Sequence, residues 1–364
     1  MTAVPAPDTG PDAGAVWHYG DPLGEQRAAQ TDAVVIDRSH RAVLTLTGAD
    51  RQSWLHNIST QHVSELAEGA STENLSLDGQ GRVEDHWIQT ELAGFTYLDT
   101  EAWRGEPLLD YLRKMVFWSD VTPAAADIAV LSLLGPRLSE QPVLDALGVD
   151  VLPAAMTAVL LPGGGFLRRM AGARGDHIEL DVLVPRRDWA DRVQRLTQAG
   201  VRAAGVWTYE AHRVAALRPR LGVDTDERTI PHEVGWIGGP GVGAVHLDKG
   251  CYRGQETVAR VHNLGKPPRM LVLLHLDGSA DRPSTGDAVL AGGRAVGRLG
   301  TVVDHVDLGP VALALVKRGL PANTALVTGA DGQVAAVIDP DSVPPTDVAG
   351  AGRVAVERLR GTTR

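Results

Sequence analysis

Residues 249–256 read Lys-Gly-Cys-Tyr-Arg-Gly-Gln-Glu, and this octapeptide holds Cys251, the single cysteine of the 364-residue chain. Lys249 and Arg253 stand on either side of the thiol, and neighbouring cations favour the reactive thiolate form. The two glycines allow the backbone to turn tightly or to approach a ligand closely. The final glutamine and glutamate offer groups that suit the polar edge of a flat heterocycle. The octapeptide therefore predicts a ligand-binding loop with a functional thiol.

A single cysteine also has a simpler interpretation, as a small buried hydrophobic residue. Either way, one cysteine allows no disulfide within the chain and no metal or iron–sulfur site built from several cysteines of one chain. Such sparing use of cysteine is typical of a reducing compartment.

The overall composition describes an ordinary globular protein, with 43% hydrophobic residues, 22% charged residues and a formal net charge of −10. At roughly 150 residues per domain, the length predicts two or three domains. The acidic balance argues against direct nucleic-acid binding, which needs a basic surface. Residues 1–14 lack the basic and apolar regions of a signal peptide, and no apolar run approaches the ~18 residues of a membrane helix. We therefore expect a cytoplasmic protein without membrane contact.

The first third of the chain mixes strands and helices. Residues 42–47 (Ala-Val-Leu-Thr-Leu-Thr) predict a strand, and Asp50 is suited to cap the helix after it. Residues 72–77 and 83–90 flank Asp-Gly-Gln-Gly, which is typical of a hairpin turn. Asp85 and the glutamate before it are neighbours on the second strand. Because neighbours on a strand face opposite ways, at most one of them points into a given pocket.

The middle of the chain predicts a separate α+β unit. Its expected elements are strands at 128–134, 157–161, 166–170 and 178–184 and helices at 141–147 and 189–199. This order with short loops predicts a sandwich of ferredoxin-like type.

The last third begins with a helix at 207–217 and continues into the octapeptide. Short strands with glycine turns follow, starting at 257–261 and 269–276, and their spacing of ~8–12 residues predicts a small β-barrel. The predicted fold class is therefore α+β, with ferredoxin-like α/β domains followed by a C-terminal small β-barrel. No histidine or cysteine pair has the spacing of a metal site, so we expect none.

The octapeptide resembles the signature Lys-Gly-Cys-Tyr-x-Gly-Gln-Glu of the YgfZ-type folate-binding proteins, which are relatives of the glycine-cleavage T-protein, an aminomethyltransferase. It matches all seven specified positions. Upstream segments resemble the same superfamily: the helix at 209–213, a Gly-Val-Asp turn at 222–224, and Ile-Pro-His-Glu at 230–233. The likeness covers residues 30–335 in outline and is specific across 207–256.

The resemblance implies a domain plan. It comprises a disordered arm (1–16), a folate-binding domain (17–125 plus 205–262), an inserted ferredoxin-like domain (126–204), a C-terminal β-barrel (263–340) and a tail (341–364).

The resemblance also implies a cofactor, tetrahydrofolate, bound where the domains meet. Cys251 would be the functional thiol and Lys249 its support. The expected folate-binding residues are Tyr209, Arg213, Tyr252, Arg253, Gly254, Gln255 and Glu256. Family members help to maintain iron–sulfur enzymes and thereby affect tRNA modification, which implies iron–sulfur client proteins as partners.

Two positions bear on an alternative function, aminomethyl or methyl transfer to folate. In T-proteins a hairpin acid acts on the substrate, and Asp85 occupies the comparable place, although an edge-strand acid facing water explains it equally well. T-proteins also carry a folate-binding glutamate two residues after a helix arginine. If Arg213 is that arginine, Ala215 replaces the glutamate, which argues against full transferase chemistry. A scaffold with an empty pocket is the third hypothesis.

Overall fold

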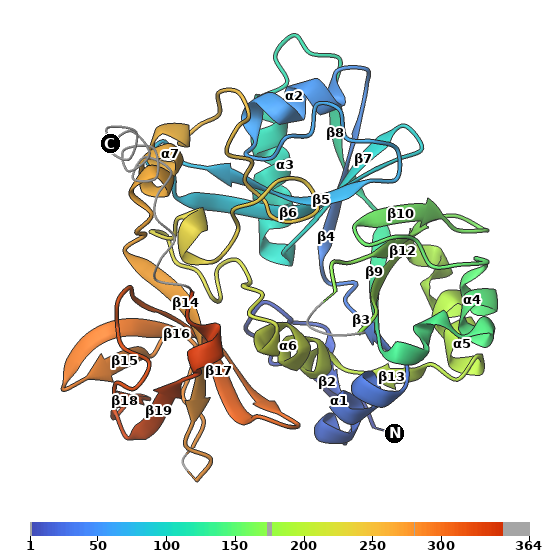
Figure 1. Cartoon of the computed structure of the whole chain (residues 1–364). Coiled ribbons are helices and arrows are strands. Elements are labelled where there is room, and N and C mark those ends of the chain that lie inside the picture. Colours follow the sequence, from blue (N-terminus) through green and yellow to red (C-terminus); the bar gives the residue numbers. More distant parts are fainter. Residues whose placement is uncertain (1, 173–176, 280, 345–364) are drawn as a thin grey trace, which may run out of the picture.

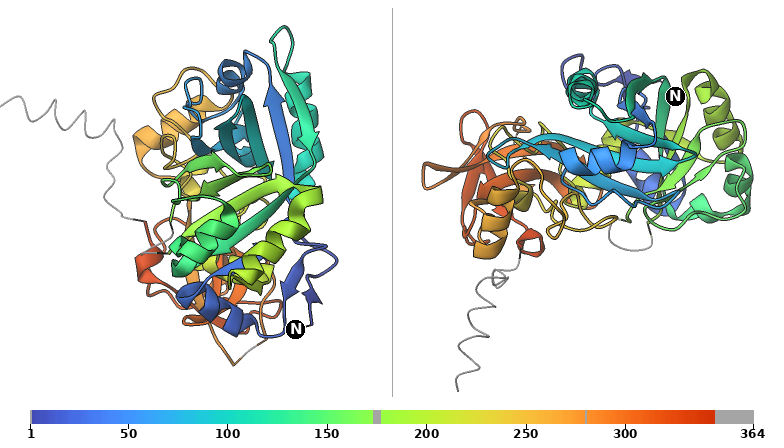
Figure 2. Two further views of the ribbon diagram at one scale, coloured as in Figure 1. Left: turned by 90° about the vertical axis from the view of Figure 1, so that its right-hand side faces the viewer. Right: turned by 90° about the horizontal axis from the view of Figure 1, so that it is seen from above.

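The computed structural model describes residues 2–172, 177–279 and 281–344, which form three lobes around helix α6 (Val206–Ala215), as Figure 1 shows. One lobe contains a five-stranded sheet, the second a six-stranded sheet, and the third a closed barrel. Seen from above, the molecule is elongated, with the barrel and the six-stranded sheet at opposite ends (Figure 2). The predicted fold class, mixed α and β with a C-terminal barrel, is confirmed.

The five-stranded sheet is antiparallel and has the strand order β5-β6-β7-β4-β8. Apolar side chains on one face, including Trp87 and Leu98, pack against Trp54 of α2 and Leu112 of α3. The elements are β4 (Ala42–Thr47), α2 (Arg51–Ile58), β5 (Ser71–Leu77), β6 (Val83–Leu92), β7 (Phe95–Thr100), α3 (Gly105–Lys114) and β8 (Thr122–Ala126). The hairpin predicted around residues 78–81 is the β5–β6 connection.

The six-stranded sheet has the order β10-β11-β12-β9-β3-β13, and helices α4 and α5 cover a leucine- and valine-rich core. Its elements are β3 (Val34–Asp37), β9 (Ile128–Leu134), α4 (Gln141–Leu147), β10 (Thr157–Leu160), β11 (Phe166–Arg169), β12 (Glu179–Pro185), α5 (Trp189–Gln198) and β13 (Arg202–Ala204). Strand β3 lies outside the 126–204 range expected for this unit. It joins because Val34, Val35 and Ile36 are all buried, as a strand inside a sheet requires.

The barrel closes as β14-β17-β16-β15-β18-β19. Its elements are β14 (Arg269–Leu276), β15 (Ala288–Ala291), β16 (Arg294–His305), β17 (Gly309–Lys317), β18 (Leu326–Thr328) and β19 (Val334–Ile338). Alternate residues of β14 serve two cores, since Val272 and Leu274 fill the barrel whereas Leu271 and Leu273 pack outward against Val214 of α6. This shared wall fixes the barrel against the other lobes.

The expectation of a disordered arm over residues 1–16 is wrong. Strand β1 (Val4–Pro5) pairs with β2 (Val16–His18), which leads into α1 (Pro22–Thr31). Between the two strands the carboxylate of Asp12 is buried and forms an ion pair with Arg220, 2.9 Å away. One buried carboxylate thus orders a segment that is otherwise poor in apolar residues.

The expected strand at 257–261 is also wrong, because the chain forms helix α7 (Gln255–Leu264) there. Gly254 and Gly265 bound this helix in left-handed conformations, and Val258 packs into the core. Of the expected tail, residues 345–364 lie outside the described residues, and the other domain boundaries remain predictions.

Candidate functional site

Lys249 anchors the octapeptide to the end of helix α2. Its side chain is buried, and Nζ donates hydrogen bonds to the backbone oxygens of Ser59 (2.6 Å), Gln61 (3.3 Å) and His56. Carbonyls at a helix C-terminus lack partners within the helix, and a cation there is favourable. Burial lowers the pKa of Lys249 to about 8. Among the described residues no contact joins this ammonium to the thiol. The lysine instead holds the octapeptide against the end of α2.

Cys251 and Tyr252 are adjacent but differ in burial. Cys251 is exposed as a free thiol. Tyr252 is buried in the core between the β5–β6 hairpin and the barrel, and burial raises the pKa of its hydroxyl to about 12. The octapeptide therefore holds its tyrosine inside and presents its cysteine to solvent, where a partner molecule can reach it.

Gly254 brings the octapeptide against the hairpin tip. Its φ is +82°, and a Cβ atom there would lie 2.6 Å from the backbone oxygen of Asp78 and 2.8 Å from Cα of Gly81. Gln255 donates a hydrogen bond to the backbone oxygen of Lys249 at 3.3 Å, and Glu256 is exposed. These three residues of the predicted folate set therefore shape the loop and begin α7.

Asp85 and Arg253 meet at a hollow beside α3, which we call the α3 hollow. It measures about 350 Å³ and is lined by Glu84, Asp85, Arg104, Tyr111 and Arg253. Both neighbouring acids of β6 thus border one hollow, so the expectation that at most one of them would do so is wrong. The carboxylate of Asp85 accepts hydrogen bonds from Nε of Arg104 (2.6 Å) and from the hydroxyl of Ser76 (2.7 Å). Arg253 forms an exposed pair with Glu84 at 3.1 Å. The hollow is rich in charge, and both oxygens of Asp85 already have partners.

The remaining two predicted residues, Arg213 and Tyr209, come from α6 and lie far from solvent. Arg213 is buried and pairs with Glu210 (2.5 Å) and Asp224 (2.7 Å). Tyr209 donates its hydroxyl hydrogen to Glu179 at 3.2 Å, and the guanidinium of Arg38 lies 3.6 Å above its ring. Arg213 is thus satisfied by protein carboxylates, while Tyr209 belongs to the polar centre where the lobes meet.

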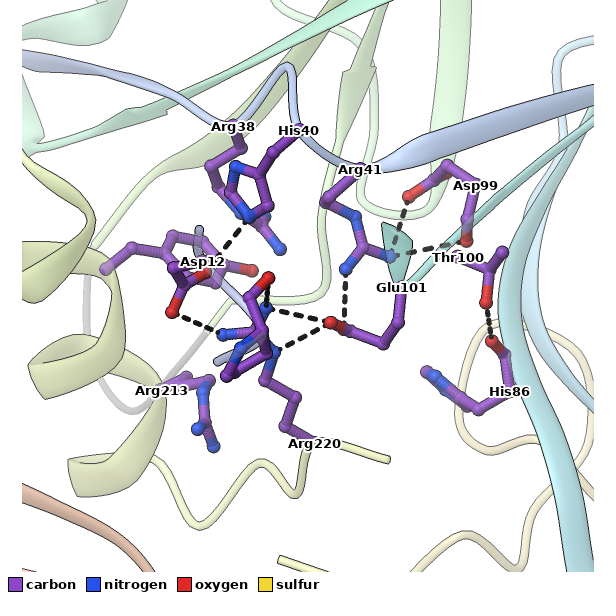
Figure 3. Close-up of polar contacts among 12 residues, drawn as sticks. Asp12, Arg38, His40, Arg41, His86, Asp99, Thr100, Glu101, Arg213 and Arg220 are labelled. Carbon is purple, nitrogen blue, oxygen red and sulfur yellow. Dashed lines mark hydrogen bonds and ion pairs between the residues drawn. The ribbon is translucent and has the colours of Figure 1, made fainter. Parts of the chain in front are cut away.

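Buried ion pairs connect the N-terminal segment, the five-stranded sheet and the six-stranded sheet at this centre, which we call the junction. Figure 3 shows the pairs of Arg41 and Arg220. The distances between the paired nitrogen and oxygen atoms are 2.9 Å for Arg220–Asp12, 2.8 Å for Arg220–Glu101 and Arg41–Glu101, and 2.7 Å for Arg168–Asp99 and Arg168–Asp181. Burial opposes ionisation of Glu101, but the charges of Arg220 and Arg41 prevail and lower its pKa to about 2. Each carboxylate in these ion pairs therefore has an arginine partner.

Sequence reasoning missed the pair formed by Glu73 and His86 at the edge of the junction. Nε2 of His86 lies 2.7 Å from Oε2 of Glu73, and the His86 ring stacks on Trp236 with centroids 4.8 Å apart and planes 8° apart. His86 follows Asp85 on β6, so the two side chains face opposite sides of the sheet. That alternation was visible in the sequence, and the histidine, not the aspartate, faces Trp236.

A second hollow of about 160 Å³ lies between α1 and α6, and we call it the α6 hollow. It is lined by Gln26, Ala29, Gln30, His177, Thr208, Ala211, His212, Ala215, Ala216 and His305. Ala215, the position that departs from the T-protein pattern, is among these residues. The hydroxyl of Thr208 is buried and has no hydrogen-bond partner, so the hollow offers a free polar group to a ligand.

Comparison with known proteins shows which superfamily the chain resembles. The family model described as the GCVT N-terminal domain matches residues 18–156. The tRNA-modifying protein YgfZ of Edwardsiella ictaluri is 27% identical over 78% of this chain and 84% of its own length. The chain is similar to the glycine-cleavage T-protein superfamily and, over most of its length, to the YgfZ-type proteins.

Members of the superfamily that are named aminomethyltransferases are similar to this chain to a comparable degree. An aminomethyltransferase of Chromobacterium violaceum is 28% identical, and the match spans 60% of this chain but only 61% of that protein. The crystal structure of aminomethyltransferase T from Bartonella henselae superposes with a TM-score of 0.81 and 19% identity, covering 97% of this chain and 95% of that one. The three-lobed T-protein fold is therefore present throughout the chain.

The junction offers groups that fit a folate, the cofactor that similarity to this superfamily implies. Nε and Nη2 of Arg218 are buried without partners, and the separate α6 hollow has the free hydroxyl of Thr208. A pterin carries several acceptors and donors on a flat ring, and a folate ends in carboxylates, which suit arginine. Within the described residues no three His, Cys, Asp or Glu side chains are placed to hold a metal ion. No helix in the described part is long and apolar enough to cross a membrane.

Proposed function

We propose that this protein binds tetrahydrofolate at the junction and uses the exposed thiol of Cys251 to support assembly or repair of iron–sulfur clusters in client proteins, and thereby tRNA modification. It would act in the cytoplasm, with folate and iron–sulfur proteins as its partners. The relatives named YgfZ and the T-protein fold support this function.

The observation that carries the proposal is the exposure of Cys251 on a fastened loop. Lys249 and Gly254 fix the loop at both ends, whereas the thiol itself has no partner among the described residues. A packing role would bury the side chain, so exposure favours reactivity. Folate contacts at the octapeptide stay a prediction for Arg253, Glu256 and their neighbours.

The test has two parts. Calorimetric titration should detect binding of tetrahydrofolate to the intact chain. In cells that lack the protein, Cys251→Ala should fail to restore the activity of an iron–sulfur enzyme, whereas Asn263→Ala, an exposed change on α7, should restore it. Full rescue by the cysteine variant would remove the thiol from the function.

A second candidate function is aminomethyl transfer, favoured by the presence of Asp85 in a hollow with Arg253. The similarity to aminomethyltransferases is compatible with this function. However, residue 215 is an alanine, and both carboxylate oxygens of Asp85 already accept hydrogen bonds. Formation of methylene-tetrahydrofolate from an aminomethyl donor would establish this function in place of the first.

A further inference from the structure

Glu73 is an ionised carboxylate enclosed by several parts of the protein. Burial opposes its ionisation, but the hydrogen bond with His86 and the charges of His86, Arg218 and Arg168 together hold its pKa below the usual value. Those partners come from strand β6, the segment after α6, and β11. The carboxylate therefore lies where the five-stranded sheet, the six-stranded sheet and α6 meet.

The side chain of Glu73 nevertheless keeps 34% of its surface accessible. Charged groups from three parts of the chain lie around it, and this accessible surface leaves the carboxylate open to a ligand. Oε2 interacts with His86, and Oε1 has no protein partner among the described residues. An ionised carboxylate has about four acceptor positions, so most of them remain available to a ligand.

The surroundings hold this carboxylate in a fixed position. His86 is confined between Glu73 and the face of Trp236, which is itself buried. Arg218 forms a 2.7 Å pair with Glu179 and has two further guanidinium nitrogens without partners. The site thus combines one carboxylate in a fixed position with unpaired donors, which suits a flat heterocycle that has both donors and acceptors.

We propose that Glu73 binds the amino-pyrimidine edge of a reduced pterin, with His86 and Trp236 as positioning residues. This inference rests on the proposed function and names the residue that recognises its ligand. The ring nitrogen N3–H and the 2-amino group of a pterin are adjacent donors, and they match the two oxygens of one carboxylate as a guanidinium does. Glu73 would supply the carboxylate that is missing at Ala215.

The test compares 5-formyltetrahydrofolate with its 2-desamino analogue by calorimetry. The unmodified protein should bind the amino compound about 10–100-fold more tightly, as expected for one bidentate contact. In Glu73→Gln the preference should fall to nearly one, since an amide cannot accept both hydrogen bonds. Glu65→Gln, an exposed change before β5, should retain the full preference.

The outcomes separate this inference from the function on which it rests. If the unmodified protein binds both compounds equally, or Glu73→Gln keeps the preference, folate binding stands and the role of Glu73 is wrong. If the unmodified protein binds neither compound, both proposals fail. Equal binding of the two compounds by the unmodified chain would overturn the role of Glu73 even if the variant does not fold.

Discussion

At the scale of single residues, neighbouring side chains of the octapeptide have different roles. Lys249 satisfies three carbonyls at the end of α2, Tyr252 packs inside, and Cys251 reaches solvent. The lysine therefore stabilises the fold, whereas the exposed cysteine is available for a reaction. Stability measurements and thiol reactivity can test these two roles independently.

Lys249→Met should lower the free energy of unfolding by about 1–3 kcal/mol, because it leaves buried carbonyl oxygens without a donor. Relief of the buried charge offsets part of this loss. Urea unfolding measures the effect, with Lys266→Met, an exposed lysine just after α7, as the matched control. Equal stability of the two variants would show that the ammonium contributes nothing to the fold.

His56 should make the protein sensitive to mild acid. Burial, together with the charge of Lys249 and of two nearby histidines, lowers the pKa of His56 from 6.5 to about 4. The unfolded chain then binds the proton more tightly than the folded one, so stability falls as the pH drops from 6.5 towards 4. His56→Gln should give a shallower slope of unfolding free energy against pH over this window. An unchanged slope would exclude His56 as a source of the acid sensitivity.

At the scale of elements, the contact between the octapeptide and the hairpin tip decides where α7 begins. Gly254→Ala would strain a left-handed residue and push a Cβ into the backbone of residues 78–81, so we expect a loss of at least about 1 kcal/mol. Gly250→Ala, four residues earlier, meets no atom within 4 Å and should change stability little. Thermal unfolding of both variants measures the difference. Comparable melting temperatures would argue against the close contact.

Much of the secondary structure could be predicted from the chain because its signals are local. The β5–β6 hairpin follows from Asp-Gly-Gln-Gly, and the barrel follows from regularly spaced glycine turns. Helix α7 could not be predicted, since its β-branched residues favour a strand until tertiary contacts at Gly254 and Val258 decide otherwise. The candidate site was anticipated only in part, because Glu73 meets His86 and Trp236 through the folded chain.

At the scale of the whole molecule, the N-terminal segment helps to join the five-stranded sheet to α6 and the segment after it. Arg220 pairs with Asp12 of this segment, Glu101 after β7 and Glu210 of α6. Few apolar residues in the segment signal this attachment, so it was missed from the sequence. The junction is thus a polar centre assembled from distant parts of the chain.

Asp12→Asn should weaken that assembly, because it removes one charge from a buried network and leaves His40 and Arg220 less well paired. We expect a loss of about 1–3 kcal/mol in unfolding free energy. Asp8→Asn, an exposed change in the same segment, should have little effect. If both variants unfold alike, the segment does not contribute to the junction as described.

The most direct measurement of the whole account is a crystal structure of the protein soaked with 5-formyltetrahydrofolate. The account predicts density for the pterin inside the junction, with its amino edge at Glu73, and Cys251 still exposed on its loop. Density at the octapeptide surface with an empty junction would contradict it.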